Sequence, residues 1–201
     1  MAAQSFEPGE ITAAVLAGGE GRRLDGRDKG LVEACGQPLI AHVVAALEGQ
    51  ANTIMISANR NAEAYAHFGK VVADFAPGFR GPLAGIATAL AHCSTPWLLT
   101  VPVDVPRPPA DIARQLFAAA TDAGADVAVA YEDALPQPMF ALYRSRLAES
   151  AATALAQDLP VWRWQQQIRA IEVFFDSEAK AFENLNTAED ITAWERTHAG
   201  G

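Results

Sequence analysis

The sequence predicts an α/β protein with a doubly wound, mostly parallel β-sheet and helices on both of its faces. Short apolar runs typical of buried strands recur along the chain, and segments with helical periodicity alternate with them. The 201 residues are 50% hydrophobic, which is enough to bury a sizeable core. We therefore expect one domain over residues 1–201, with residues 1–10 as a flexible N-terminus.

Each element follows from a local pattern. Pro38 suits the first turn of a helix whose apolar residues form one stripe, and Asn186 or Thr187 can cap the last helix. Prolines and glycines predict a loop over 75–81 and a turn over 132–138. The expected strands are 11–16, 53–57, 71–74, 97–102, 126–131, 139–143 and 168–175, and the expected helices are 38–47, 62–68, 83–92, 110–123, 147–156 and one from about 187.

Charge and composition exclude several classes of protein. The net charge of −9 provides no basic field to attract nucleic acid. Two cysteines, Cys35 and Cys93, lie far apart and form neither a disulfide framework nor a recognisable metal site, which is typical of a reducing compartment. The sequence begins without a basic and apolar leader, and no apolar run approaches ~18 residues. We expect a monomeric cytoplasmic protein without nucleic-acid or membrane partners.

The loop after the first strand predicts a phosphate site. Its glycines allow backbone N–H groups to approach phosphate oxygens closely, and four of the fifteen basic residues follow between Arg22 and Lys29. Such cations neutralise a triphosphate and the charge that develops during phosphoryl transfer. A Walker A run is absent, and the dinucleotide fingerprint fails because Leu24 stands where its last glycine belongs. The alternative is an ordinary βα turn with a solvated basic rim.

Polar residues follow several of the other expected strands. Ser57 and Asn59 come after the second strand, Asp74 after the third and Asp104 after the strand at 97–102. Because ligands of open α/β sheets bind beyond the carboxyl ends of the strands, these side chains can converge on one rim. A carboxylate such as Asp104 needs a partner there, and Mg²⁺ prefers hard oxygen ligands of this kind. A helix N-cap or a structural ion pair is the alternative for Asp104.

The loop resembles that of nucleotidyltransferases that join an NTP to a phosphorylated acceptor. The resemblance lies in Leu16-Ala17-Gly18-Gly19-x-Gly21-x-Arg23-Leu24 followed by Asp28-Lys29-Gly30. The Asp-Lys-Gly-Leu form is similar to that of molybdenum cofactor guanylyltransferases. Residues 57–61, 81–86, 102–106 and 182–187 also match, in the order of that family, so the resemblance spans nearly the whole chain. It implies a Rossmann-like nucleotidyltransferase fold.

The resemblance also implies a reaction and a set of site residues. GMP would pass from GTP to the terminal phosphate of molybdopterin, with or without molybdenum, and pyrophosphate would leave. Lys29 would hold the triphosphate, Arg23 would stabilise the leaving pyrophosphate, and Asp104 would bind Mg²⁺ or Mn²⁺. Asp74 would help to bind the guanine nucleotide. The other implied binding residues are Leu16, Ala17, Gly18, Gly19, Ser57 and Asn59 for the nucleotide, and Asn184 and Asn186 for the pterin acceptor.

Other interpretations of the same residues remain. Asn184 and Asn186 can serve only turn and capping chemistry before the last helix. Lys29 and Arg23 can be surface cations paired with Asp25 or Asp28. The alternative functions are a molybdopterin cytidylyltransferase, a sugar-1-phosphate nucleotidyltransferase and a non-catalytic nucleotide-binding regulator of the same fold. The implied protein partners are those that deliver the cofactor and molybdoenzyme-specific chaperones.

Overall fold

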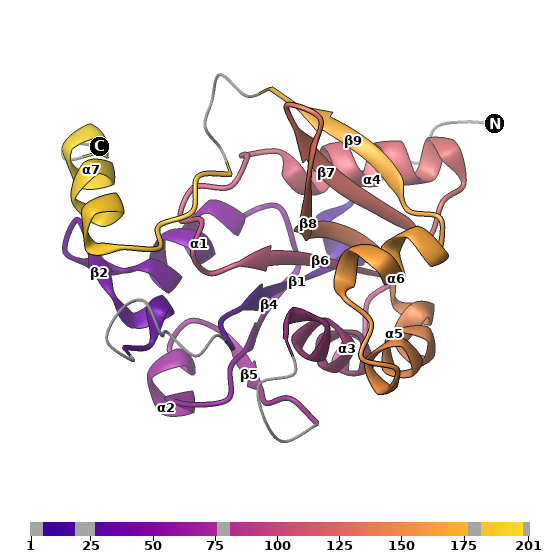
Figure 1. The fold of residues 1–201 in the computed structure, drawn as a ribbon, viewed down its shortest axis with the longest axis horizontal. Coiled ribbons are helices and arrows are strands. Elements are labelled where there is room, and N and C mark those ends of the chain that lie inside the picture. Colours follow the sequence, from indigo (N-terminus) through magenta and orange to yellow (C-terminus); the bar gives the residue numbers. More distant parts are fainter. Residues whose placement is uncertain (1–5, 19–26, 76–80, 177–181, 199–201) are drawn as a thin grey trace.

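A central seven-stranded sheet organises the computed structural model, which describes residues 6–18, 27–75, 81–176 and 182–198 (Figure 1). The strand order is β5-β4-β1-β6-β8-β7-β9. These strands are β1 (Ile11–Leu16), β4 (Thr53–Ser57), β5 (Lys70–Val72), β6 (Trp97–Pro102), β7 (Val127–Glu132), β8 (Leu135–Arg144) and β9 (Ile171–Phe175). A small antiparallel ribbon of β2 (Glu33–Ala34) and β3 (Gln37–Pro38) stands apart from the sheet.

The directions of the strands confirm the mostly parallel sheet that the sequence predicts. Strands β5, β4, β1 and β6 are parallel neighbours, and β7 pairs in parallel with β9. Only β8 runs against its neighbours β6 and β7 among the strands of this sheet in the described residues. The carboxyl ends of β1, β4, β5 and β6 therefore lie along one edge.

Helices cover both faces of the sheet (Figure 1). Alternate residues of β1 enter two separate cores: Val15 packs with α1 and α4 on one face, and Ala14 packs with α3, α5 and α6 on the other. The helices are α1 (Leu39–Leu47), α2 (Ala62–Tyr65), α3 (Pro82–His92), α4 (Ile112–Ala123), α5 (Ala148–Ala156), α6 (Val161–Gln167) and α7 (Ala188–His198). The 3₁₀ turns in the described residues are η1 (Pro8–Glu10), η3 (Lys29–Leu31) and η4 (Ser145–Leu147).

The hairpin between β7 and β8 is tighter than expected. The expected turn over 132–138 is wrong, because β8 begins at Leu135 and includes both prolines. This part of β8 pairs with β7, whereas its pairing with β6 begins only at Ala141. Pro136 and Pro138 are tolerated there because a proline can sit on a strand side that needs no N–H donor.

Helix α6 is a second difference from the expected elements. Residues 161–167 were not expected to be helical, and β9 begins at Ile171 instead of residue 168. Trp164 attaches the helix to its neighbours: its ring stacks on Tyr143 of β8, with centroids 5.3 Å apart, and its Nε1 donates to Ser150 Oγ of α5 at 3.0 Å. Val161 and Trp164 are spaced as on one face of a helix, but so short a pattern predicts a helix only weakly from sequence. Burial of both residues in the core beside the sheet stabilises α6.

Residues 6–10, part of the segment expected to be flexible, form a local structure. Phe6 packs edge-on against Phe117 of α4, with ring centroids 5.7 Å apart, and η1 follows it. This contact attaches the start of the described chain to the core, while residues 1–5 lie outside the described part. Of the helices in the described segments, none combines the length and the apolar character that crossing a membrane requires.

The β7–β8 turn provides a test of backbone strain. Asp133 and Ala134 have φ values of 48° and 62°, a left-handed conformation that costs an L residue about 1–2 kcal/mol. Ala134→Gly should therefore raise the free energy of unfolding, by up to about 1 kcal/mol after the greater freedom of unfolded glycine is subtracted. The matched change Ala118→Gly, on the exposed face of α4, should lower it by about 1 kcal/mol. Denaturant unfolding measures both, and a loss of stability in both variants would contradict the proposed strain.

Candidate active site

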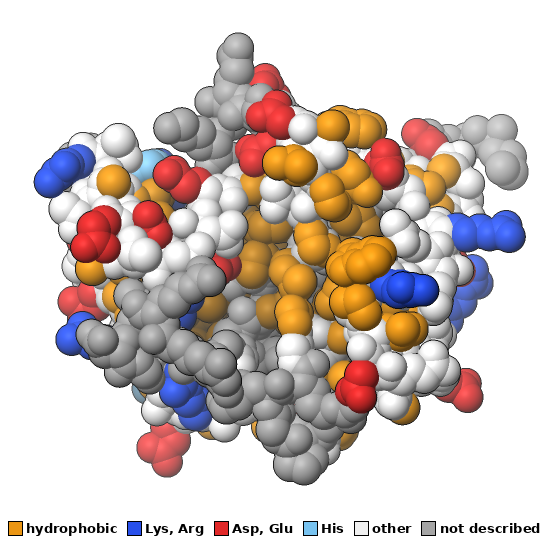
Figure 2. Space-filling view, viewed as in Figure 1, with side chains coloured by type: hydrophobic (Ala, Val, Ile, Leu, Met, Phe, Trp, Pro, Cys, Tyr) orange, Lys and Arg blue, Asp and Glu red, His pale blue; other side chains and the backbone are white. Residues whose placement is uncertain are grey.

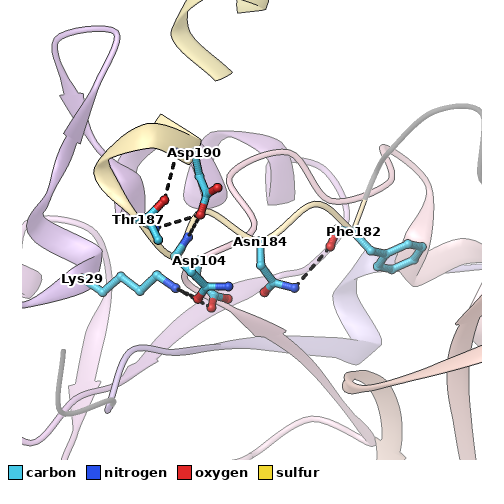
Figure 3. A network of polar contacts seen from close by, with 7 residues as sticks. Lys29, Asp104, Phe182, Asn184, Thr187 and Asp190 are labelled. Atoms are coloured by element: carbon cyan, nitrogen blue, oxygen red, sulfur yellow. Dashed lines mark hydrogen bonds and ion pairs between the residues drawn. The ribbon is translucent and has the colours of Figure 1, made fainter. Parts of the chain in front are cut away.

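An ion pair lies at the carboxyl edge of the sheet. Lys29 opens the turn η3, and Asp104 follows the end of β6. Lys29 Nζ donates to Asp104 Oδ2 at 2.8 Å, and the two side chains are 17% and 23% exposed (Figure 3). The pair is thus partly desolvated and still open to a ligand. Of the alternative partners, Asp28 bonds elsewhere and Asp25 lies outside the described residues.

Two asparagines from the C-terminal segment join this pair. Lys29 Nζ also donates to Asn186 Oδ1 at 2.6 Å. When the amide nitrogen of Asn184 is turned toward Asp104, it donates to both carboxylate oxygens, at 3.2 Å and 3.1 Å. The backbone N–H of Leu185 donates to the Asp104 carbonyl oxygen at 2.8 Å, which holds the segment in place. Four polar side chains from three distant parts of the chain therefore meet at one point.

The start of α7 explains why Asn186 is available to Lys29. Thr187 Oγ1 accepts a bond from the Asp190 N–H at 3.1 Å, so Thr187 caps the helix. In return, Asp190 Oδ2 accepts from the N–H groups of Asn186 and Thr187, at 2.9 Å and 2.8 Å (Figure 3). These backbone N–H groups, first that of Asn186, hold the pKa of the Asp190 carboxyl below its ordinary value. Asp190 bonds only to the backbone of Asn186, so the side chain of Asn186 remains available to Lys29.

A second polar cluster lies at the ends of β1, β4 and β5. Asn59 and Asp74 bond reciprocally: Asn59 Nδ2 donates to Asp74 Oδ2, and the Asp74 N–H donates to Asn59 Oδ1, each at 2.8 Å. A Cβ on Gly18 would lie 3.5 Å from Asn59 Nδ2 and 4.0 Å from Asp74 Oδ2. The glycine of the first loop therefore approaches the Asn59–Asp74 pair closely, as the expected convergence requires.

Ser57 lies beneath this second cluster. It is 2% exposed, and its hydroxyl faces Asp74 Oδ1 at 3.5 Å. A Cβ on Gly85 of α3 would come within 2.7 Å of Ser57 Oγ, so the small residue lets the helix approach the strand end. The neighbouring Ala17 N–H donates to the Ser57 carbonyl oxygen at 2.9 Å, which extends the β1–β4 pairing past Leu16. Ser57 thus contacts the Asp74 carboxylate from the buried side of the cluster.

Some expected site residues cannot be placed. Gly19 and Arg23 lie outside the described residues. Within the described segments, no group of three or more His, Cys, Asp or Glu side chains is arranged to hold a metal ion. Sequence reasoning missed Asp190, although Thr187-x-x-Asp190 is a capping-box spacing that predicts it. It also missed Tyr65, for which no local motif is a signal.

An apolar surface borders the site on the other side. Figure 2 shows hydrophobic side chains gathered over β7, β8, β9 and α6, beside a hollow in this face. Large exposed hydrophobic residues of these elements are Leu135, Trp162 and Phe174, which are 65%, 49% and 61% exposed. The molecule therefore presents polar groups on the α7 side and apolar groups on the β7–β9 side.

Comparison with known proteins identifies the family. The MobA-like NTP transferase domain matches residues 13–171. A molybdenum cofactor guanylyltransferase of Shewanella putrefaciens is 41% identical over 185 residues, which cover 91% of this chain and 95% of the relative. One from Ralstonia nicotianae is 41% identical over 193 residues, covering 90% and 94%. The chain belongs to the MobA-like NTP transferase family and, within it, to the group of the molybdenum cofactor guanylyltransferases. This confirms the family that the sequence resembles.

A solved structure agrees in fold. Molybdopterin-guanine dinucleotide biosynthesis protein A from Archaeoglobus fulgidus superposes with a TM-score of 0.75 at 24% identity, covering 94% of this chain and 100% of that one. The shared fold is the doubly wound sheet described above.

The Asp190 cap leads to a prediction of pH dependence. A carboxyl whose pKa is lowered by folding stabilises the protein above its ordinary pKa, about 3.9 for aspartate, and this stabilisation is lost as the pH falls through the lowered value. The difference in unfolding free energy between the wild type and Asp190→Asn should therefore be largest near neutral pH and shrink below about pH 4. Denaturant unfolding across that range measures it. Asp122→Asn, at an exposed position of α4, is the control for the loss of one charge, and an identical pH profile would contradict the prediction.

Proposed function

We propose that the protein transfers GMP from GTP to the terminal phosphate of molybdopterin and releases pyrophosphate. Relatives that are about 40% identical over nine-tenths of the chain are named for this activity. The observation that supports it most is the meeting of Lys29, Asp104, Asn184 and Asn186 at the carboxyl edge of the sheet.

The reaction needs positioning and electrostatic stabilisation more than acid–base chemistry. An oxygen of the acceptor phosphate attacks the α-phosphorus of GTP, a new P–O bond forms, and the bond to the pyrophosphate oxygen breaks. Because the attacking phosphate is already ionised, no general base is required. Lys29 neutralises the triphosphate, and Arg23 stabilises the leaving pyrophosphate. Lys29 exchanges its contact with Asp104 for phosphate oxygens when the nucleotide binds.

The residues present fit a divalent cation. Mg²⁺ takes one or two protein oxygens and completes its shell with waters and substrate phosphates, and Mn²⁺ takes similar ligands. Asp104 would provide the carboxylate. Asn184 lies beside it, and a rotation of its amide would offer an oxygen in place of the nitrogen that faces Asp104. When bound, the ion would offset the charge of the phosphates in the transition state.

The second cluster serves the nucleotide. Asp74 accepts bonds from the donor edge of guanine or from a ribose hydroxyl, while Asn59 and Ser57 hold its carboxylate in place. Backbone groups of residues 16–19 approach the phosphates. Asn184 and Asn186 contact the acceptor near its phosphate, since both already touch the Lys29–Asp104 pair. The apolar surface over β7–β9 is suited to the flat pterin ring.

Nucleotide choice tests the proposal. Purified protein is incubated with molybdopterin, Mg²⁺ and each of GTP, CTP and ATP, and pyrophosphate release is assayed. We expect turnover with GTP, and GTP binding at least tenfold tighter than CTP or ATP binding, a gap of about 1.4 kcal/mol by calorimetry. Equal or better binding and turnover with CTP would assign the protein to the cytidylyltransferases, and no pyrophosphate with any NTP would make it a non-catalytic binder.

Substitution of Asp104 distinguishes an enzyme from a non-catalytic nucleotide-binding protein. Asp104→Asn keeps the shape but removes the charge, so turnover should fall by about 100-fold or more. GTP affinity without metal should stay the same or improve, because a negative charge beside the triphosphate is gone. Asp126→Asn is the matched control, since Asp126 also pairs with a cation, Arg146, but at the start of β7. A variant that only melts earlier, with unchanged activity per folded molecule, would mean that Asp104 is structural.

A further inference from the structure

Asp28, the residue before Lys29, is held by groups that the proposed reaction does not use. Its side chain is only 5% exposed. It accepts hydrogen bonds from the Tyr65 hydroxyl at 2.5 Å and from Asn61 Nδ2 at 2.9 Å, and Arg60 Nε lies 3.7 Å away. A buried carboxylate requires such donors, because an unpaired charge in the interior is very costly. The start of the Lys29 turn is thereby attached to α2 and the residues before it.

The same tyrosine also packs closely against the residue after Lys29. A Cβ on Gly30 would lie 2.4 Å from Tyr65 Oη and 3.1 Å from its Cε1. It would also lie 2.9 Å from Cγ2 of Val103, the residue before Asp104. Gly30 is thus wedged between Tyr65 and the Asp104 segment, so one side chain contacts both flanks of Lys29.

Tyr65 remains a donor throughout the working pH range. It is fully buried, and burial first, then its bond to Asp28, raises the pKa of the hydroxyl far above its ordinary value. The hydroxyl therefore keeps its proton and remains the donor of the bond to Asp28. The hydrogen bond from Tyr65 to Asp28 therefore holds the start of the Lys29 turn, and we call this contact the clamp.

We propose that Tyr65 is a positioning residue for the catalytic pair, acting through Asp28 and Gly30 to set where Lys29 Nζ lies relative to Asp104. This inference deepens the proposed function and rests on it. A lysine has a long, flexible side chain, so the position of its Nζ depends on how firmly its backbone is held. A shift of about 1 Å at a positioning group can lower turnover by about 100-fold.

The first test compares two buried tyrosines. Tyr65→Phe removes the donor to Asp28 but keeps the ring. Tyr143→Phe is the matched control, because Tyr143 is also fully buried and its hydroxyl accepts a bond from Gln165 at 2.7 Å, on the other face of the sheet. Both variants should lose some thermal stability. Only Tyr65→Phe should lower kcat, by about tenfold to 100-fold. Its Kd for GTP should rise by a smaller factor, because Lys29 also holds the triphosphate.

A second test uses the contact with Gly30. Gly30→Ala should lower turnover in the wild type, because its extra carbon meets the Tyr65 hydroxyl. The same change should cost less turnover in Tyr65→Phe, where that oxygen is gone and the remaining contacts are 2.9 Å and 3.1 Å. If the fold-loss of turnover in the double variant equals the product of the fold-losses in the two single variants, the proposed role of Tyr65 is contradicted. If Tyr65→Phe does not fold, Asn61→Gly removes the other donor to Asp28 at a position with φ of 54°, and should lower kcat in the same direction.

A third measurement requires no reaction. The N–H groups of Leu31 and Val32 close the Lys29 turn, bonding to the carbonyl oxygens of Asp28 and Lys29 at 3.0 Å and 3.2 Å. Their hydrogen exchange should accelerate in Tyr65→Phe and stay unchanged in Tyr143→Phe. Failure of the wild type to release pyrophosphate would overturn the proposed function, and with it the catalytic part of this inference. Normal turnover and normal exchange in Tyr65→Phe would overturn the inference alone.

Discussion

The ion pair between Lys29 and Asp104 is the contact on which the arrangement of the site depends. Its partners come from a turn after β1 and from the end of β6, and the neighbouring strands β1 and β6 bring them together. A partly exposed pair of this kind adds little to stability, about 0–1 kcal/mol. In the proposed reaction, its role is functional. A phosphate would replace Asp104 as the partner of Lys29, and a metal ion would replace Lys29 as the partner of Asp104.

The pair is held on two sides by residues from other parts of the chain. On one side, Tyr65 clamps the turn through Asp28 and Gly30. On the other, the C-terminal segment bonds both members of the pair through Asn184 and Asn186. That segment lies beyond residues 13–171, the part that matches the family domain, and a small core of its own fastens it to the protein. Its members are Ala34, Leu39, Leu185, Ile191 and Trp194.

The site has two poles with different physical character. Gly18, Asn59 and Asp74 form a hydrogen-bonding cluster, and Lys29 and Asp104 form a charged pair. In the proposed function, the first would bind the nucleotide and the second its phosphates. Asn59, Asp74 and Asp104 follow strands of a sheet that is buried on two faces, so packing in the core restricts their movement. This rigidity suits a reaction that depends on placing an ionised phosphate opposite an α-phosphorus.

The sequence by itself determined the family and the parallel sheet, because these depend on local patterns: short motifs, apolar runs and the helical segments that alternate with them. Only the tertiary structure decided the partners of the site residues. Lys29 and Asn186 are 157 positions apart, and Asp28 and Tyr65 are 37 apart, so no local spacing predicts either contact. Helix α6 and the prolines in β8 depended in the same way on neighbours across the sheet. Side-chain pairing is set by how strands and helices pack, and packing is a property of the whole chain.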